Sequence, residues 1–173
     1  MKKTVTDIFI FLFFLISIPL PQVQVGDWNA FTSPLKINSI ALIGDSIICA
    51  TSGGLLIKNK EQVNTISKID GLYGVDIVAI GKDNYHNIWL GGNSPNGFIQ
   101  IYNFNKGSID VFDYGLTSIS EFWLSDSLAF ASFVDGQDSG IIKFIYENGK
   151  WSYRDIYRNF PFSIESISGF DIL

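Results

Sequence analysis

The residues able to do acid–base or metal chemistry are few in this chain and form no known catalytic pattern. His86 is the sole histidine and lies in a turn-like segment, DNYHN (83–87). A general base needs a nucleophile or substrate within hydrogen-bond reach. Neither a G-x-S-x-G elbow nor a second histidine for a metal triad accompanies it. We therefore expect His86 to be a solvated turn residue, and we predict that the protein is not an enzyme, with no catalytic residue and no cofactor.

The segment DGQDSG (135–140) gathers carboxylate and hydroxyl oxygens in a glycine-containing loop. Oxygen ligands of this kind bind calcium, which makes Asp135 and Asp138 candidate ligands. The segment lacks the spacing and the closing bidentate glutamate of an EF-hand, and a plain turn with side-chain-to-backbone bonds accounts for it better. We favour the turn and predict no metal site. Asp83 and Asn84 are interpreted in the same way, as ordinary turn residues.

An aromatic and basic cluster, WSYRDIYRNFPF (151–162), is the best candidate for a binding surface. Tyr, Trp and Arg dominate interaction hot spots, and we name Trp151, Tyr153, Arg154 and Tyr157 as the candidate residues. Strict alternation along a strand would place the three aromatic residues on one face and Arg154 on the other. The outermost strand of a β-sheet would show the same mixture, so we favour a purely structural role and keep the binding surface as the alternative.

The candidate residues lie within a sequence pattern that repeats about every 43 residues. Gly54, Gly97 and Gly140 are 43 residues apart, and each begins an apolar run: GGLLIKN (53–59), NGFIQIYN (96–103) and SGIIKFIY (139–146). A second landmark is a glycine–leucine pair, which occurs at Gly71 and Leu72 and again at Gly115 and Leu116. A period of about 40–45 residues with several short strands per unit is typical of β-propeller blades.

Apolar residues at spacing two, interrupted by turn residues every six to ten positions, predict short antiparallel strands. The predicted fold class is all-β: a β-propeller with about three four-stranded blades, at 37–72, 75–116 and 118–160, and the start of a fourth from 163. Because propellers need about four to eight blades, we expect an incomplete ring, with 26–173 as the N-terminal part of the propeller. Trp89 and Trp123 are expected to anchor the packing between sheets.

Residues 1–25 have the pattern of an export signal. Two lysines precede an apolar stretch of 13 residues (8–20), which is short for a membrane span and suited to a signal peptide. A small-residue cleavage site is missing, so an uncleaved N-terminal anchor remains as an alternative. We predict a signal peptide rather than a stable membrane span, and an exported protein in the periplasm, the outer membrane or on the cell surface.

The charge balance limits the classes of partner. The formal net charge is −5 at pH 7, and no run of basic residues occurs. Nucleic-acid binding depends on lysine and arginine contacts to phosphates, so we predict no nucleic-acid partner. Cys49 is the only cysteine and lies in an apolar run, where a small buried side chain is the expected role.

Residues 71–103, GLYGVDIVAIGKDNYHNIWLGGNSPNGFIQIYN, resemble the two-component-regulator propeller repeat, with Asn87 where that repeat usually has glycine. The start of the chain carries a more specific resemblance. GDWNAFTS (26–33), followed by INSIALIGDSIICATSGGLLIKN and ISKIDGL, resembles the N-terminal propeller of PorZ-like proteins of the type IX secretion system.

These resemblances imply two functions. The PorZ-like one implies an exported, non-catalytic component of cell-surface attachment, whose partners are a PorU-like sortase complex or a surface glycan such as lipopolysaccharide. The repeat implies, as the alternative, the periplasmic ligand-sensing propeller of a hybrid two-component regulator. An enzyme built on a propeller is a third and weaker possibility.

Overall fold

The computed structural model describes residues 33–60 and 62–158 of the 173-residue chain. The predicted export signal, most of the segment 26–33 and the fourth blade expected from 163 lie outside the described residues.

Within the described residues, twelve strands form three four-stranded antiparallel sheets. The first sheet contains β1 (Ile37–Ile43), β2 (Ser46–Thr51), β3 (Gly54–Asn59) and β4 (Gln62–Ile66). The second contains β5 (Asp76–Lys82), β6 (Ile88–Ser94), β7 (Gly97–Asn103) and β8 (Gly107–Leu116). The third contains β9 (Ser118–Leu124), β10 (Leu128–Asp135), β11 (Asp138–Glu147) and β12 (Lys150–Tyr157). A short 3-10 turn, η1 (Lys68–Asp70), follows the first sheet.

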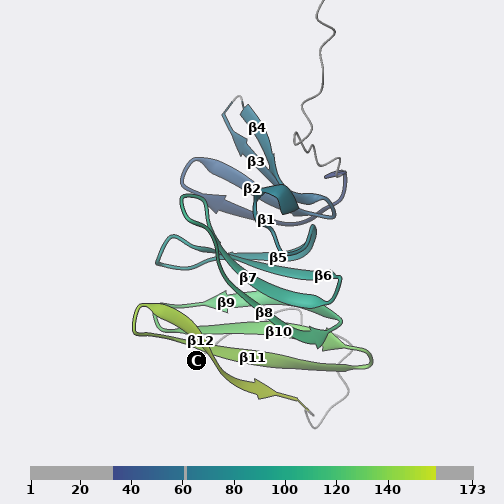
Figure 1. Ribbon diagram of the computed structural model, residues 1–173, viewed down its shortest axis with the longest axis vertical. Helices are drawn as coiled ribbons and strands as arrows, with labels where there is room; N and C mark the ends of the chain where they lie inside the picture. The colour runs from purple at the N-terminus through teal and green to yellow at the C-terminus, as the bar shows by residue number, and fades with distance from the viewer. Residues whose placement is uncertain (1–32, 61, 159–173) are drawn as a thin grey trace, which may run out of the picture.

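The three sheets are stacked face to face along the long axis of the molecule (Figure 1). Every sheet keeps its strands in chain order, so each connection inside a sheet is a tight hairpin. The first strands β1, β5 and β9 contact one another from sheet to sheet. This is the order of strands in propeller blades, and the predicted all-β propeller fold is confirmed, with the described blades forming an open stack.

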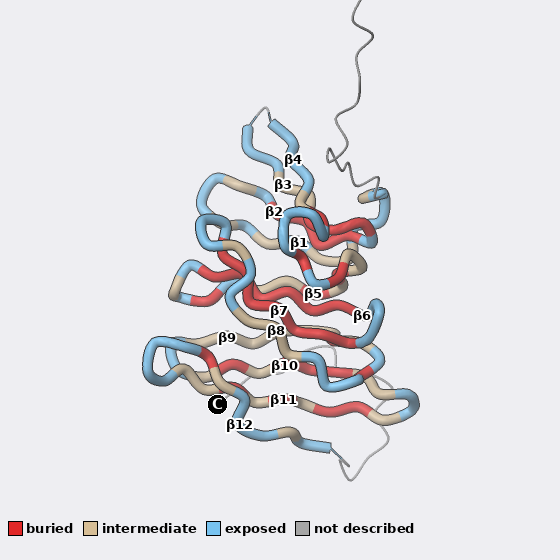
Figure 2. Tube along the Cα trace, in the orientation of Figure 1, coloured by how far each residue is buried: buried red, intermediate tan, exposed pale blue. Residues whose placement is uncertain are grey.

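The apolar core lies between the sheets, because each sheet can bury its apolar face only against its neighbour. Buried stretches follow the middle strands of every sheet (Figure 2). One buried cluster joins the first two sheets and includes Ile48, Leu55, Ile77 and Leu90. A second joins the second and third sheets and includes Trp89, Ile99, Phe133 and Phe144.

The glycines spaced 43 residues apart occupy one structural position, the start of the third strand of each sheet. A Cβ atom there would lie 2.2 Å from the Ile66 carbonyl oxygen at Gly54, and 2.3 Å from the Tyr157 carbonyl oxygen at Gly140. At Gly97 it would lie 2.8 Å from the Ser118 amide nitrogen. The chain leaving the fourth strand therefore passes directly over this position in all three sheets. The repeat in the sequence reflects a close backbone approach that excludes any side chain.

The glycine–leucine pairs mark where the chain leaves the outer strand. Gly71 follows η1 with φ +96°, and Gly115 is the penultimate residue of β8 with φ +67°, conformations that glycine adopts without strain. The leucines that follow, Leu72 and Leu116, are both buried. The pair thus turns the backbone and places an apolar anchor between two sheets.

Trp89 and Trp123, both expected to anchor the packing between sheets, differ in their positions. Trp89 is fully buried between the second and third sheets. Trp123 lies on the opposite face of the third sheet, is half-buried, and contacts Phe130 at a ring distance of 5.8 Å. The alternation along β9 turns the Trp123 side chain away from the second sheet, so its expected role between sheets is not tested by the described residues and stays a prediction. Cys49 is buried and free, as expected of a small apolar side chain.

We expect Gly140→Ala to destabilise the fold by about 2 kcal/mol, because the added methyl group overlaps the Tyr157 carbonyl and the Phe133 ring. Urea unfolding of the full-length chain, followed by circular dichroism, measures the effect. Gly136→Asn is the matched control on the same hairpin. Its φ of +65° is one that asparagine tolerates, and open space surrounds its Cβ position. Equal stability of the two variants would contradict the steric role of Gly140.

Candidate ligand-binding groove

A groove lies between the second and third sheets at the end of the molecule that carries the β5–β6, β7–β8 and β11–β12 turns. It has a volume of about 220 Å³. Its walls come from both sheets; the lining residues are Tyr85, Asn87, Ile101, Lys106, Ile109, Asp110, Tyr146, Gly149, Lys150 and Trp151. Ligand pockets occur at interfaces between structural units and combine apolar walls with polar groups. The groove lies at such an interface, and its lining is about equally polar and apolar.

Aromatic rings from both sheets form the apolar wall of the groove. Tyr85, in the β5–β6 turn, stacks on Tyr146 of β11 with ring centroids 3.6 Å apart and planes at 16°. Trp151 of β12 meets Tyr146 edge-on at 5.2 Å. The Tyr85 hydroxyl donates to the Asp126 carbonyl oxygen in the β9–β10 turn. The turn of the second sheet is therefore fastened to the third, and its tyrosine ring is held in place.

A buried carboxylate lies behind this wall. Asp83 is only 1% exposed, and its Oδ2 atom accepts hydrogen bonds from the indole nitrogens of Trp151, at 2.9 Å, and Trp89, at 3.4 Å. Asn87 donates to the same oxygen at 3.0 Å. Asp83 accepts from backbone nitrogens of its own turn, as interpreted from the sequence, and its side chain also links two sheets, which the sequence did not predict. Asn87, in the usual glycine position of the repeat, is likewise buried and accepts from the Asn103 side chain.

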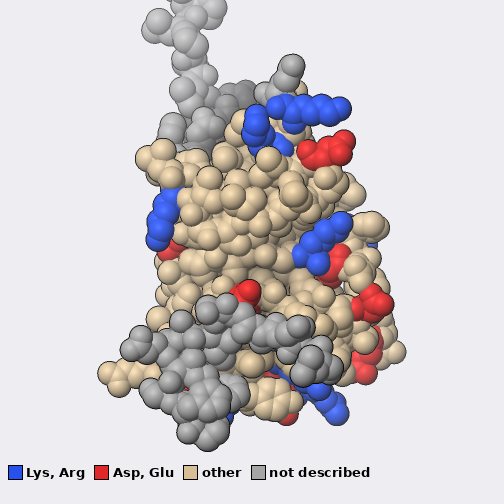
Figure 3. Space-filling view, turned by 180° about the vertical axis from the view of Figure 1, so that it is seen from behind, with Lys and Arg blue, Asp and Glu red and all other residues tan. Residues whose placement is uncertain are grey.

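Charged side chains stand around the mouth of the groove. Lys106 and Lys150 are exposed, and Asp110 is half-buried. The ion pairs recorded among the described residues involve Arg158 and none of these three side chains. Seen from the back of the molecule, charged side chains of both signs lie around a broad uncharged area (Figure 3). The groove thus combines aromatic surface with charges free to contact a ligand.

The aromatic surface continues from the groove along the outer strands β8 and β12. Tyr114 and Tyr153 approach with ring centroids 5.4 Å apart and are 38% and 43% exposed. Phe112 packs beneath them against Phe144 at 5.0 Å. We call the line of Phe112, Tyr114 and Tyr153 between the two sheets the seam. Its exposed rings form a surface that a binding partner can contact.

The structure separates the four residues predicted for the binding surface. Trp151 is 4% exposed and lines the groove from within, and Tyr153 extends the seam. Arg154 and Tyr157 are exposed but do not line the groove. Strict alternation fails because a bulge at Arg154 shifts the register, so that Lys143 faces Asp155 while Phe144 faces Tyr153. As a result Ile156, rather than Tyr157, packs on the core.

The calcium candidates are engaged with an arginine. The Arg158 guanidinium lies 2.7 Å from the Asp135 carboxylate and 3.6 Å from that of Asp138. The same guanidinium lies over the Phe133 ring at 4.8 Å. The segment 135–140 is a tight hairpin, since Asp135 and Asp138 pair with each other across the β10–β11 turn. Both carboxylates therefore already face a cation supplied by the chain.

His86 lies on the exposed side of the turn that carries Asp83, with φ +64°. Its carbonyl oxygen accepts from Asn103, which fixes the turn. In the part of the chain that the structure describes, no cluster of three or more His, Cys, Asp or Glu side chains is arranged to hold a metal. The same part contains no apolar helix of membrane-spanning length.

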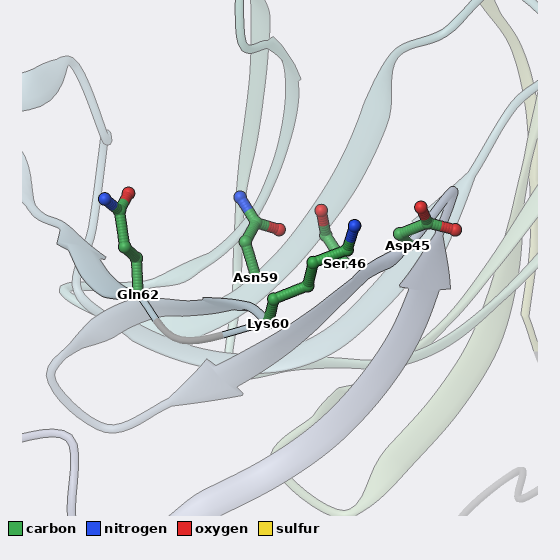
Figure 4. A pocket seen from close by; sticks show the side chains of 5 residues that line it. All are labelled: Asp45, Ser46, Asn59, Lys60 and Gln62. Atoms are coloured by element: carbon green, nitrogen blue, oxygen red, sulfur yellow. The ribbon is translucent and has the colours of Figure 1, made fainter.

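A second hollow, of about 470 Å³, lies at the hairpin ends of the first sheet. Asp45, Ser46, Asn59, Lys60 and Gln62 line it, and Figure 4 shows Lys60 reaching along the hairpins toward Ser46. All five side chains are polar or charged and belong to one sheet. With no aromatic ring and no wall from a second sheet, this hollow has less of the character of a ligand site than the groove.

Comparison with known proteins finds a similar fold among solved structures. No family model matches the sequence, and no curated protein matches it. Among solved structures, the fold is similar to the extracellular domain of a hybrid two-component system from B. thetaiotaomicron, with a TM-score of 0.53 and 14% identity. The similarity covers 69% of this chain and 17% of that one. At this identity the likeness shows the fold alone.

The seam predicts an alkaline transition. Burial, with smaller contributions from Tyr153 and Asp110, raises the pKa of Tyr114 from 10.0 to about 12. The unfolded chain therefore loses this proton at a lower pH than the folded protein does, and stability contributed by neutral Tyr114 is lost as the pH rises from 10 toward 12. We expect Tyr114→Phe to weaken this alkaline loss, measured as melting temperature against pH. An unchanged pH profile would contradict the packing of Tyr114 in the seam.

Proposed function

We propose that this chain is a non-catalytic, exported ligand-binding module of the kind found outside the membrane in hybrid two-component regulators. The observation that carries the proposal is the likeness of its stacked blades to the extracellular domain of such a system. The two-component-regulator repeat in residues 71–103 points the same way, and the apolar stretch 8–20 supports export. The ligand binds in the groove between the second and third sheets.

The groove supports this role through its chemistry. Tyr85, Tyr146 and Trp151 offer flat apolar surface, and Lys106, Lys150 and Asp110 offer charged groups at the mouth. Aromatic residues contribute large contact area with few rotatable bonds, which lowers the entropy lost on binding. Because the walls come from two sheets, a bound ligand also contacts two structural units, as a sensor requires.

A second function is favoured by the start of the chain. The segments 26–33 and 37–59 resemble the N-terminal propeller of PorZ-like proteins, which supports a scaffold role in type IX secretion with a PorU-like sortase complex or lipopolysaccharide as partner. In that role the seam of β8 and β12 is the natural protein-contact surface. Because the same fold serves either role, the two functions are distinguished by their effects in the cell.

Deletion of the gene distinguishes the two. If the protein is a regulator, the deletion makes a set of transcripts lose their response to a change of growth substrate, while surface-attached cargo is retained. A PorZ-like scaffold requires that proteins with a sorting domain be lost from the cell surface while transcription is unaltered. Absence of both effects would contradict both functions.

Charge reversal at the groove provides the sharper prediction. We expect Lys106→Glu with Lys150→Glu to abolish the transcriptional response as the deletion does, because it reverses both positive charges at the mouth of the groove. Each loss of about 1.4 kcal/mol of binding free energy in this way lowers the affinity for the ligand tenfold. The matched control is Lys58→Glu with Lys60→Glu, which makes the same charge change at the end of the first sheet that carries the second hollow. Immunoblots verify equal protein levels. A wild-type response in the groove variant, or loss of response in the control, would contradict the assignment of the groove.

A further inference from the structure

Asp83 is the buried acidic side chain of the described structure, and its bonds cross from one sheet to the next. Its Oδ1 atom accepts from the backbone nitrogens of Tyr85, at 2.9 Å, and Asn87, at 2.8 Å. Its Oδ2 atom accepts from the Trp151 indole, 68 residues further along the chain. One carboxylate thus fixes the backbone of Tyr85 and the ring of Trp151, which line the groove from different sheets.

The neighbours of Asp83 extend this connection to the third sheet. Asn84, the next residue, donates its side-chain amide to the Asp126 carboxylate. Tyr85 donates its hydroxyl to the Asp126 carbonyl and stacks on Tyr146. The turn 83–87 therefore forms a polar clasp from the second sheet to the third, and the groove opens beside it.

Stacking of the sheets does not by itself require this clasp. At the corresponding turn of the first sheet, Asp45 is exposed, and the buried cluster at that junction is apolar apart from the rim hydroxyl of Tyr102. The Asn38 side chain donates to the Ile77 carbonyl oxygen across this junction, which contains no buried carboxylate among the described residues. Burying a carboxylate costs free energy unless hydrogen bonds compensate for the lost water, whereas apolar packing carries no such cost. The five donors around Asp83 supply what apolar packing lacks, which is a fixed direction and distance between groups on two sheets.

We propose that Asp83 is the positioning residue of the groove and sets how Tyr85 and Trp151 face each other across the second and third sheets. The role as part of a ligand site rests on the proposed function, whereas the positioning itself is measured without ligand. A ligand that contacts either ring acts, through Asp83, on the spacing of the two sheets.

The test uses spin labels on both sides of the groove in the full-length chain. Lys106→Cys and Lys150→Cys, in a Cys49→Ala background, place one label on each sheet, and pulsed electron paramagnetic resonance gives the distance distribution between them. We expect Asp83→Asn and Trp151→Phe each to broaden the distribution and shift it to longer distances. Trp151→Phe removes a single donor and leaves the other four bonds to Asp83, so it carries the test if Asp83→Asn does not fold.

Trp89→Phe is the matched control. It removes an indole donor of the second sheet from the same Asp83 oxygen and also reduces a ring that packs between the two sheets. It therefore measures the effect of lost packing without the loss of a hydrogen bond between sheets. A purely stabilising role for Asp83 predicts equal broadening in the two tryptophan variants. That result, or a wild-type distribution in Trp151→Phe, would overturn the proposal. A shifted distribution together with an unaffected cellular response in the groove variant would remove the proposed function and leave the positioning role of Asp83 intact.

Discussion

Burial of apolar side chains between successive sheets is the interaction on which the rest of this structure depends. A four-stranded sheet of this length cannot cover its own apolar face, so Ile48 and Leu55 need the second sheet, and Phe133 and Phe144 need it from the other side. This requirement forces the sheets to lie close and places the outer strands side by side. The groove and the aromatic seam exist because two neighbouring edges are brought together.

The two junctions between sheets solve this problem differently. The first combines an apolar cluster with a part-buried hydrogen bond from the Asn38 side chain to the Ile77 carbonyl oxygen. The second adds the clasp of residues 83–87, in which the buried Asp83 carboxylate joins Trp89 and Trp151. Directional bonds hold groups at defined distances, and apolar contacts alone allow small shifts. The junction with the most defined geometry is thus also the one with the aromatic groove at its end, which is the arrangement expected of a recognition site.

Much of the fold could be predicted from local patterns, and the site only in part. Period-two alternation and turn residues located the strands because these signals depend on neighbours in sequence. The four residues chosen on β12 did not form one surface, since the bulge at Arg154 changed which side chains face the core. Asp83 was missed because its partner Trp151 lies 68 residues away, and only the five-residue length of its turn distinguished it from the shorter turn at Asp45.

The sequence by itself determined the all-β blades and the positions where only glycine fits, because strand period and close backbone approach recur within each repeat. Tertiary structure alone decided which side chains meet between repeats. It placed Trp151 against Asp83 and brought Tyr85 onto Tyr146. The physical reason is that these contacts depend on the stacking and register of separate sheets, and no pattern within a single repeat encodes that relation.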